Sequence, residues 1–259
     1  MTNSRALGLS IMLLFAMLWL PLGQYDFLLE HWMKIGTYGV PFLLLGAFSL
    51  RHQGDEGGVF QDFRFIGILM LIAYILHQFE EHWVDVLGNT YAFYTFNNNF
   101  ILGNLGEPDS EVKPLTEAAI FVINTALVWL VGALAIYRSP RHLFPLISMA
   151  SIIFVNALVH ILAAIAQFQY NPGLLTSVVI FVPIYLWFVK YLTTRFTKSK
   201  KQLIGGIIWA VLAHVIMVGG LLMANWFHII PEFVYFIALG VWSLLPLAIF
   251  AKSPLQEVV

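Results

Sequence analysis

The sequence predicts an all-α fold, a polytopic transmembrane helix bundle with about eight spans. Hydrophobic residues make up 60% of its 259 residues and charged residues only 10%, and the mean hydropathy is +0.83. A soluble domain typically carries about 25% charged residues, so this composition excludes a soluble globular protein. Apolar runs of about 20 residues, the length that crosses a bilayer as a helix, recur along the chain. We expect residues 1–259 to form a single integral membrane domain.

Eight segments have the length and composition of spanning helices. The second, residues 34–50, is the weakest because it contains Gly36, Gly39 and Pro41, and a re-entrant segment there would leave seven spans. Residues 1–22 resemble a secretory signal but lack a small-x-small cleavage site, so we expect them to be retained. The expected spans are residues 6–22, 34–50, 63–86, 116–137, 143–169, 173–193, 203–225 and 232–251.

The basic residues give these spans an orientation. If the N-terminus is cytoplasmic, eleven of the 13 Lys and Arg residues fall on the cytoplasmic side, and only Lys34 and Lys113 fall outside. Loops rich in Lys and Arg stay in the cytoplasm, so we expect both termini to lie there. Residues 87–115 then form the longest outer connection, which is either a lid over an outward-facing site or an ordered surface loop.

Two features of the composition exclude whole classes of site. The chain has no cysteine, which excludes disulfides, thiolate metal sites, iron–sulfur clusters and a cysteine nucleophile. Its formal net charge of −1 gives no indication of nucleic-acid binding. A bound metal would therefore need imidazole, carboxylate or amide oxygen ligands.

The third expected span ends in LHQFEEHWVD, residues 76–85, which contains two adjacent glutamates and two histidines. On an α-helix, residues i, i+3 and i+4 share a face, so His77, Glu80 and Glu81 point the same way. His82 points away from His77, and we expect it to lie at the outer membrane interface. An acidic side chain inside the membrane costs about 2.5–3.5 kcal/mol on the insertion scale, so these carboxylates need partners.

Polar residues in three other spans lie at a similar depth. Asn156 and His160 share a face of the fifth span, Asn124 lies in the fourth and His214 lies in the seventh. Counted from the cytoplasmic ends at about 1.5 Å per residue, all four come close to the depth of His77. Hydrophobic patterning does not require this coincidence, whereas a shared polar site does.

Three interpretations of this cluster remain open. In the first, the glutamates lie in the solvated outer flank of the span. In the second, the polar side chains form a buried proton-relay cluster without metal. In the third, they bind a divalent metal, zinc or iron. In the metal site the expected ligands are His77, Glu80, Glu81 and His160, with Glu80 and Glu81 also as catalytic groups. His214 taken alone is more often a packing histidine than a metal ligand. The residues expected to support the site or contact the substrate are Asn124, Asn156, His214 and Glu117.

The segment LHQFEEH resembles the motif that names the HXXEE family of bacterial membrane proteins. The motif residues here are His77, Glu80 and Glu81. The later segment NALVHILAAIAQFQYNPGLLTSVVIFVPI is also similar to that family. The residues that carry this second likeness are Asn156, His160, Tyr170, Pro172 and Gly173.

The resemblance covers about residues 66–190, so residues 203–259 form an additional two-helix segment at the C-terminus. It implies a multi-pass protein of the bacterial inner (plasma) membrane with a shared intramembrane site. It implies no reaction, because the family has no established activity as a whole.

We expect a membrane-embedded, metal-dependent enzyme, a hydrolase or oxidoreductase, that acts on a lipid or other hydrophobic substrate. Its His/Glu/Asn site would lie in the outer half of the bilayer, where the metal activates water, or oxygen if it is iron. One alternative is a metal-free isomerase in which an intramembrane His/Glu pair moves protons. Another is a proton- or cation-coupled transporter. The expected partners are membrane lipid and a hydrophobic small molecule, with no nucleic acid.

Overall fold

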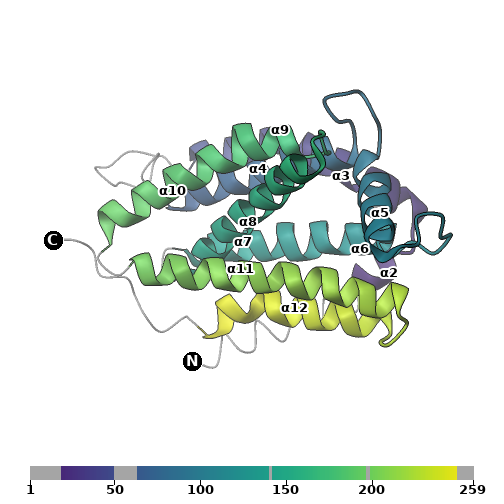
Figure 1. The fold of residues 1–259 in the computed structure, drawn as a ribbon. Coiled ribbons are helices and arrows are strands. Elements are labelled where there is room, and N and C mark those ends of the chain that lie inside the picture. Colours follow the sequence, from purple (N-terminus) through teal and green to yellow (C-terminus); the bar gives the residue numbers. More distant parts are fainter. Residues whose placement is uncertain (1–18, 50–62, 140–141, 197–198, 250–259) are drawn as a thin grey trace.

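The chain folds into a bundle of long helices (Figure 1). The computed structural model describes residues 19–49, 63–139, 142–196 and 199–249. These residues contain one isolated β-bridge and no strand. The elements, with π-helical segments labelled η, are α2 (Leu20–Leu22), α3 (Asp26–Ser49), α4 (Phe63–His82), α5 (Ala92–Leu105), α6 (Glu117–Val122), η4 (Ile123–Leu130), α7 (Val131–Arg138), α8 (Phe144–Gln167), α9 (Leu174–Thr176), η5 (Ser177–Phe181), α10 (Val182–Arg195), α11 (Ser199–Leu221), η6 (Leu222–Trp226) and α12 (Glu232–Ile249).

Five helical rods in the described part of the chain are long and apolar enough to cross a membrane. The prediction of an all-helical membrane bundle is confirmed at this level. The first expected span, residues 6–22, lies mostly outside the described residues. The second and eighth expected spans correspond to α3 and α12, which are not among the five. The five rods are Phe63–His82, Glu117–Arg138, Phe144–Gln167, Leu174–Arg195 and Ser199–Trp226.

Helix α3 differs from the weakest expected span, residues 34–50. It is a continuous helix of 24 residues that begins at Asp26 and includes Pro41. Its first three turns carry charged side chains, which make it less apolar than the five rods. Because α3 continues without a break through Pro41, a re-entrant turn within residues 34–50 is not supported.

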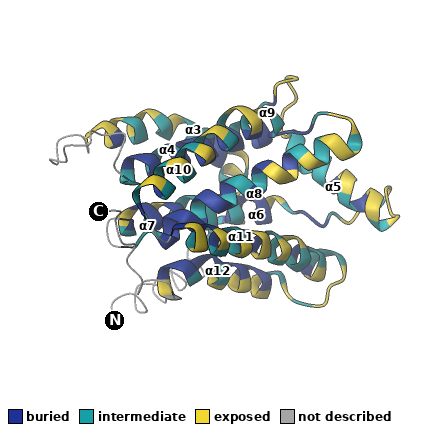
Figure 2. Ribbon diagram, turned by 60° about the vertical axis from the view of Figure 1, so that its left-hand side comes forward, coloured by how far each residue is buried: buried dark blue, intermediate teal, exposed yellow. Residues whose placement is uncertain are grey.

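The bundle exposes large apolar side chains on its outer surface (Figure 2). On α3, for example, Phe42 is 75% exposed and Leu45 is 69% exposed. Such a surface is unfavourable in water but matches lipid chains, which are as apolar as leucine. The interior between α4, α8 and the rod α9–η5–α10 is filled by tightly buried side chains, among them Ile66, Met70, Ile147, Phe181 and Phe188.

Helix α5 is an element that the sequence analysis missed. It occupies the middle of residues 87–115, the expected outer connection, and lies at the end of the bundle where α4 ends (Figure 1). Phe93 at its start lies with its ring 4.8 Å from that of His82 and 6.4 Å from that of His160. The connection is therefore an ordered element that covers the polar end of α4.

Candidate metal centre

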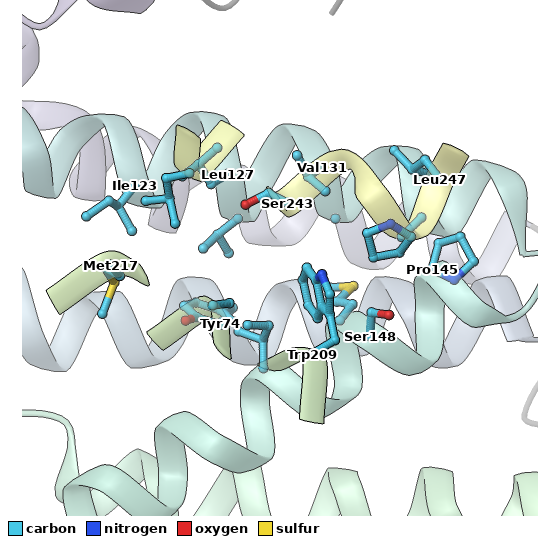
Figure 3. A pocket seen from close by; sticks show the side chains of 18 of the residues that line it. Tyr74, Ile123, Leu127, Val131, Pro145, Ser148, Trp209, Met217, Ser243 and Leu247 are labelled. Carbon is cyan, nitrogen blue, oxygen red and sulfur yellow. The ribbon is translucent and has the colours of Figure 1, made fainter. Parts of the chain in front are cut away.

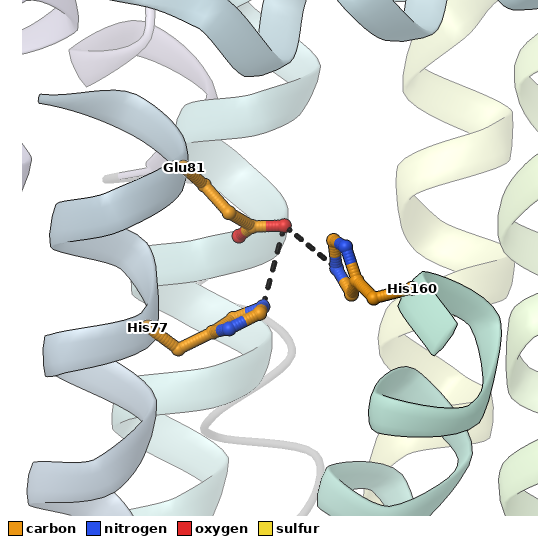
Figure 4. Close-up of side chains that lie close together, drawn as sticks. All are labelled: His77, Glu81 and His160. Carbon is orange, nitrogen blue, oxygen red and sulfur yellow. Dashed lines mark ion pairs between the residues drawn. The ribbon is translucent and has the colours of Figure 1, made fainter. Parts of the chain in front are cut away.

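Three buried side chains from two helices meet near the end of α4. His77 and Glu81 lie four residues apart on α4, and His160 reaches them from α8 (Figure 4). Nε2 of His77 lies 3.3 Å from Glu81 Oε1, and Nε2 of His160 lies 3.1 Å from the same oxygen. All three side chains are buried, and His77 is completely inaccessible. One carboxylate oxygen thus faces two imidazoles inside the bundle.

The hydrogen bonds around His77 fix which of its ring nitrogens carries the proton. Its Nδ1 lies 2.8 Å from Oγ1 of Thr176. That hydroxyl has one proton, which it donates to Glu80 Oε2 at 2.5 Å, so it accepts a hydrogen bond from His77 Nδ1–H. In the neutral ring Nε2 therefore has a lone pair. This buried nitrogen makes no hydrogen bond within the described residues, although it lies beside Glu81.

His160 is held in the same way from the loop that follows α8. Its Nδ1 lies 2.7 Å from Oδ1 of Asn171. The orientation of this amide is fixed because Asn171 Nδ2 donates to the backbone carbonyl of His160 at 2.9 Å. Oδ1 can only accept, so Nδ1 of His160 carries the proton and Nε2 has the lone pair. Metal-binding histidines show this arrangement, in which the second ring nitrogen donates to a neighbouring acceptor.

The distances from Glu81 Oε1 to the two histidine nitrogens suit a single metal ion. Ligands about 2.0–2.1 Å from a tetrahedral ion lie about 3.3 Å apart, and neighbouring ligands of an octahedral ion lie about 3.0 Å apart. The observed distances to Glu81 Oε1 are 3.1 and 3.3 Å, and the three atoms all lie within 4.8 Å of one another. Two imidazoles and one carboxylate are a ligand set of both zinc enzymes and non-haem iron enzymes.

Gly173 lies directly against this group of side chains. A Cβ atom at this position would lie 2.7 Å from Cε1 of His77, 2.8 Å from Cε1 of His160 and 3.0 Å from Cγ of Glu81. Its φ of +94° is also one that L-residues rarely adopt. The site therefore requires glycine here for both space and backbone conformation, and the backbone of Gly173 closes one side of it.

Glu80, expected as a ligand and catalytic group, lies outside the group of three. Its Oε1 accepts hydrogen bonds from the hydroxyl of Tyr170 at 2.9 Å and the N–H of Leu175 at 3.1 Å. Its Oε2 accepts from the N–H of Thr176 at 2.7 Å and from the hydroxyl of that residue. The N-terminus of the rod α9–η5–α10 thus stabilises this carboxylate. Burial and the neighbouring Glu80 raise the pKa of Tyr170, which keeps its phenol protonated.

His82, which was expected at the outer membrane interface, lies beside Glu81 in the structure. His82 is only 4% exposed, because Trp32 of α3 and Phe93 of α5 pack against its ring. Its Nε2 lies 3.4 Å from Glu81 Oε2, the carboxylate oxygen that does not face the other two histidines. Glu81 is therefore surrounded by three imidazoles, one more than the sequence analysis identified.

Behind His82 lies a chain of hydrogen bonds that includes the predicted residue Asn124. Its Nδ2 lies 3.5 Å from Nε2 of His82, and its Oδ1 accepts from Gln78 Nε2 at 2.8 Å. Gln78 in turn accepts from the indole N–H of Trp129 at 2.7 Å. Gln78 is completely buried. It was missed although it lies inside the motif, because the sequence analysis followed charged groups rather than buried amides.

The remaining predicted site residues do not reach the group of three. Asn156 donates to the hydroxyl of Tyr74 at 3.1 Å, so its role is to hold a tyrosine one turn before the first ligand. His214 donates from Nδ1 to the carbonyl of Ala210 at 2.8 Å and lines a separate apolar cavity. Glu117 is exposed in the first turn of α6. The comparison of depths along the spans therefore predicted that His160 of α8 lies close to His77. It also selected residues that the structure places elsewhere.

Residues 68–188 match the family described as a protein of unknown function with HXXEE motif. The match confirms the resemblance expected for residues 66–190. It contains all the residues of the group of three and Gly173, whereas α11 and α12 lie beyond it. No curated protein and no solved structure matches this chain.

Proposed function

We propose that the protein is a membrane-embedded, metal-dependent enzyme that acts on a lipid or other hydrophobic substrate. One divalent ion, zinc or iron, would be held by His77, Glu81 and His160. The observation that supports this most directly is that both histidines use the Nδ1 proton for another partner, so that two unprotonated Nε2 atoms lie 3.3 and 3.1 Å from one carboxylate oxygen. A bound divalent cation would relieve the repulsion between three electron-rich atoms in this buried place.

The ligand set leaves room for chemistry on the ion. Three protein ligands with an open position are typical of catalytic metal sites, whereas structural sites are closed by four. The ion would supply an activated water or, as iron, a binding place for oxygen. The chain itself contributes His82 beside Glu81 as a group that can accept or donate a proton, and the covering residues Phe93 and Gly173 limit access of bulk water.

The proposed setting is the inner membrane of a bacterium, with eight spans and both termini in the cytoplasm. The supporting observation is the distribution of Lys and Arg along the sequence. In this orientation the end of α4, and with it the metal site, lies in the outer half of the bilayer. Helix α5 would then cover the site from the outer side.

Metal content tests the proposal. The full chain is purified in mild detergent without a chelating tag, and bound metals are measured by inductively coupled plasma mass spectrometry. We expect about one zinc or iron per chain, since three ligands from one chain complete the site. The ion should be lost in His77→Ala and in Glu81→Gln. It should be retained in Glu117→Gln and in His214→Ala, two variants of the same residue types outside the group of three.

Metal-free wild-type protein, after purification in metal-supplemented buffer, would refute a metal enzyme. The second candidate function would then apply, an isomerase in which Glu81 and its histidines move a proton between two positions of the substrate. The presence of His82 as a third imidazole around one carboxylate favours this candidate over other metal-free functions. An activity that survives exhaustive chelation but is lost in Glu81→Gln would identify it.

A further inference from the structure

A second feature inside the bundle is an elongated cavity bounded by α4, η4, α7, α8, α11 and α12 (Figure 3). Its volume is about 100 Å³. Pockets that enclose a small molecule typically measure about 300–1,000 Å³. The cavity is therefore too small to enclose a drug-sized ligand, and it accommodates only part of a slender molecule.

The shape of the cavity suits a hydrocarbon chain or a flat ring system. Ile123, Leu127, Val131 and Ala135 line it at intervals of four residues along one rod. At 1.5 Å per residue, these positions extend over about 18 Å. Figure 3 shows the first three of them in a row along one wall, opposite Met217 and Trp209.

The walls carry no charge but retain hydrogen-bonding capacity. None of the residues that line the cavity is Lys, Arg, Asp or Glu. His214 uses Nδ1–H for the carbonyl of Ala210, so its Nε2 remains an acceptor. Tyr74 accepts a hydrogen bond from Asn156, and within the described residues its own hydroxyl donates none. A free acceptor and a free donor thus belong to a mainly apolar cavity, together with the hydroxyls of Ser148 and Ser243.

We propose that this cavity binds an uncharged amphiphile, a molecule with a long apolar part and one hydroxyl or carbonyl group. A charged headgroup would lose its hydration here without gaining an ionic partner, which costs several kcal/mol. A carbonyl or hydroxyl oxygen can accept from Tyr74, and a hydroxyl can donate to His214. The apolar part is buried against the aliphatic wall of η4 and α7.

The position of Tyr74 connects the cavity with the candidate metal centre. Tyr74 precedes His77 by three residues on α4, and the two rings lie 6.0 Å apart, edge to face. A polar group bound to Tyr74 is therefore separated from the first ligand by a single side chain. That the amphiphile is the substrate rests on the proposed function. Its binding in the cavity does not depend on a metal.

Helices α11 and α12 supply the wall that the family match does not cover. Trp209, Ala213, His214 and Met217 of α11 line the cavity, together with residues of α12 such as Ser243. All of them lie beyond residues 68–188, the matched segment. The candidate metal centre thus lies within the matched segment, whereas one wall of the cavity is formed by α11 and α12, which lie beyond it.

A photoreactive long-chain alcohol tests the proposal. A diazirine derivative of hexadecanol is added to the purified full chain in detergent, irradiated, and the labelled peptides are identified by mass spectrometry. We expect labelling at Trp209, Met217 and Met149, displaced by excess hexadecanol but not by the same amount of hexadecanoate at alkaline pH. Ala213→Trp fills the cavity and should reduce labelling at least about tenfold, a loss equivalent to about 1.4 kcal/mol.

The matched control is Leu212→Trp, because Leu212 precedes Ala213, is exposed on the outside of α11 and does not line the cavity. This variant should label like the wild type. His214→Phe keeps a ring of similar size but removes the acceptor, and it should abolish the preference for hexadecanol over hexadecane as competitor. Labelling spread over the outer surface, or reduced equally by both tryptophan variants, would overturn the proposal.

Metal content measured on the same samples separates this inference from the proposed function. Ala213→Trp should keep the metal content of the wild type, because Ala213 does not contact the group of three. Specific cavity labelling in a metal-free wild type refutes the metal enzyme and supports the binding site. A metal-loaded wild type without displaceable labelling supports the metal enzyme and refutes the binding site.

Discussion

Replacement of Gly173 by alanine should damage the site without removing any ligand. Two costs are expected. The φ of +94° forces alanine into a backbone conformation that costs about 1–3 kcal/mol. The new methyl group would also lie 2.7 Å and 2.8 Å from the Cε1 atoms of His77 and His160, and overpacking of this kind costs about 1–3 kcal/mol.

Gly88 provides the control that separates these two costs. Its φ is +82°, and a Cβ there would meet nothing within 4 Å, so Gly88→Ala carries the backbone cost alone. Gly173→Ala should therefore lower the free energy of unfolding by about 1–3 kcal/mol more than Gly88→Ala. If the strain is instead relieved by moving the imidazoles, the metal affinity falls by the equivalent factor, about 5–150-fold.

The assay measures thermal unfolding in detergent and zinc affinity by competition with a chromophoric chelator, for the wild type and both variants. Gly173→Ala should differ from Gly88→Ala in at least one of the two. Equal unfolding temperatures and equal affinities for the two variants would refute the reasoning, because the crowding at Gly173 would then have no consequence.

Three further predictions concern residues around the group of three. Thr176→Val leaves the Nδ1–H of His77 without an acceptor, so the metal affinity, measured by the same competition, should fall about 10–100-fold. Gln78→Leu removes the partner of the buried amide of Asn124 and of the half-buried indole of Trp129, which should lower the unfolding temperature at a cost of about 1–3 kcal/mol for the buried group while the metal content stays unchanged. The raised pKa of Tyr170 means that, above a pH of about 10, the unfolded chain releases a proton that the folded chain keeps, so stability falls as the pH rises. Tyr170→Phe should reduce this loss in unfolding scans from about pH 9 to about pH 11, and an unchanged loss would contradict the assignment.

The sequence was sufficient to identify the core of the candidate site, because the relevant relations are periodic. The spacing of His77 and Glu81 places them on one face of α4, and the depth count brought His160 to them from another span. The same count also selected His214, which lies in the separate cavity. Depth alone does not say which face of a helix points toward which neighbour, so it identifies candidates but not contacts.

The groups that decide the state of the histidines could not be predicted in this way. Asn171, Gly173 and Thr176 lie in or next to the turn between α8 and the following rod, where no periodic pattern applies. Their roles depend on how this turn folds back over α4. The burial of His82 depends on α5, a helix whose sequence, with three consecutive asparagines, has no clear apolar face. Long-range packing, rather than local propensity, determined both.

The two adjacent glutamates have different roles because consecutive residues on a helix point about 100° apart. Glu80 meets the first turn of the rod α9–η5–α10, where three donors, together with the hydroxyl of Tyr170 before the rod, satisfy its charge without a metal. Glu81 meets only imidazoles, and two of these turn lone pairs rather than protons toward it. Glu80 also holds Thr176, the residue that keeps the proton of His77 on Nδ1. In the proposed metal site, Glu80 therefore positions the element that prepares His77 as a ligand, and Glu81 would complete the ligand set, so neither can take over the role of its neighbour.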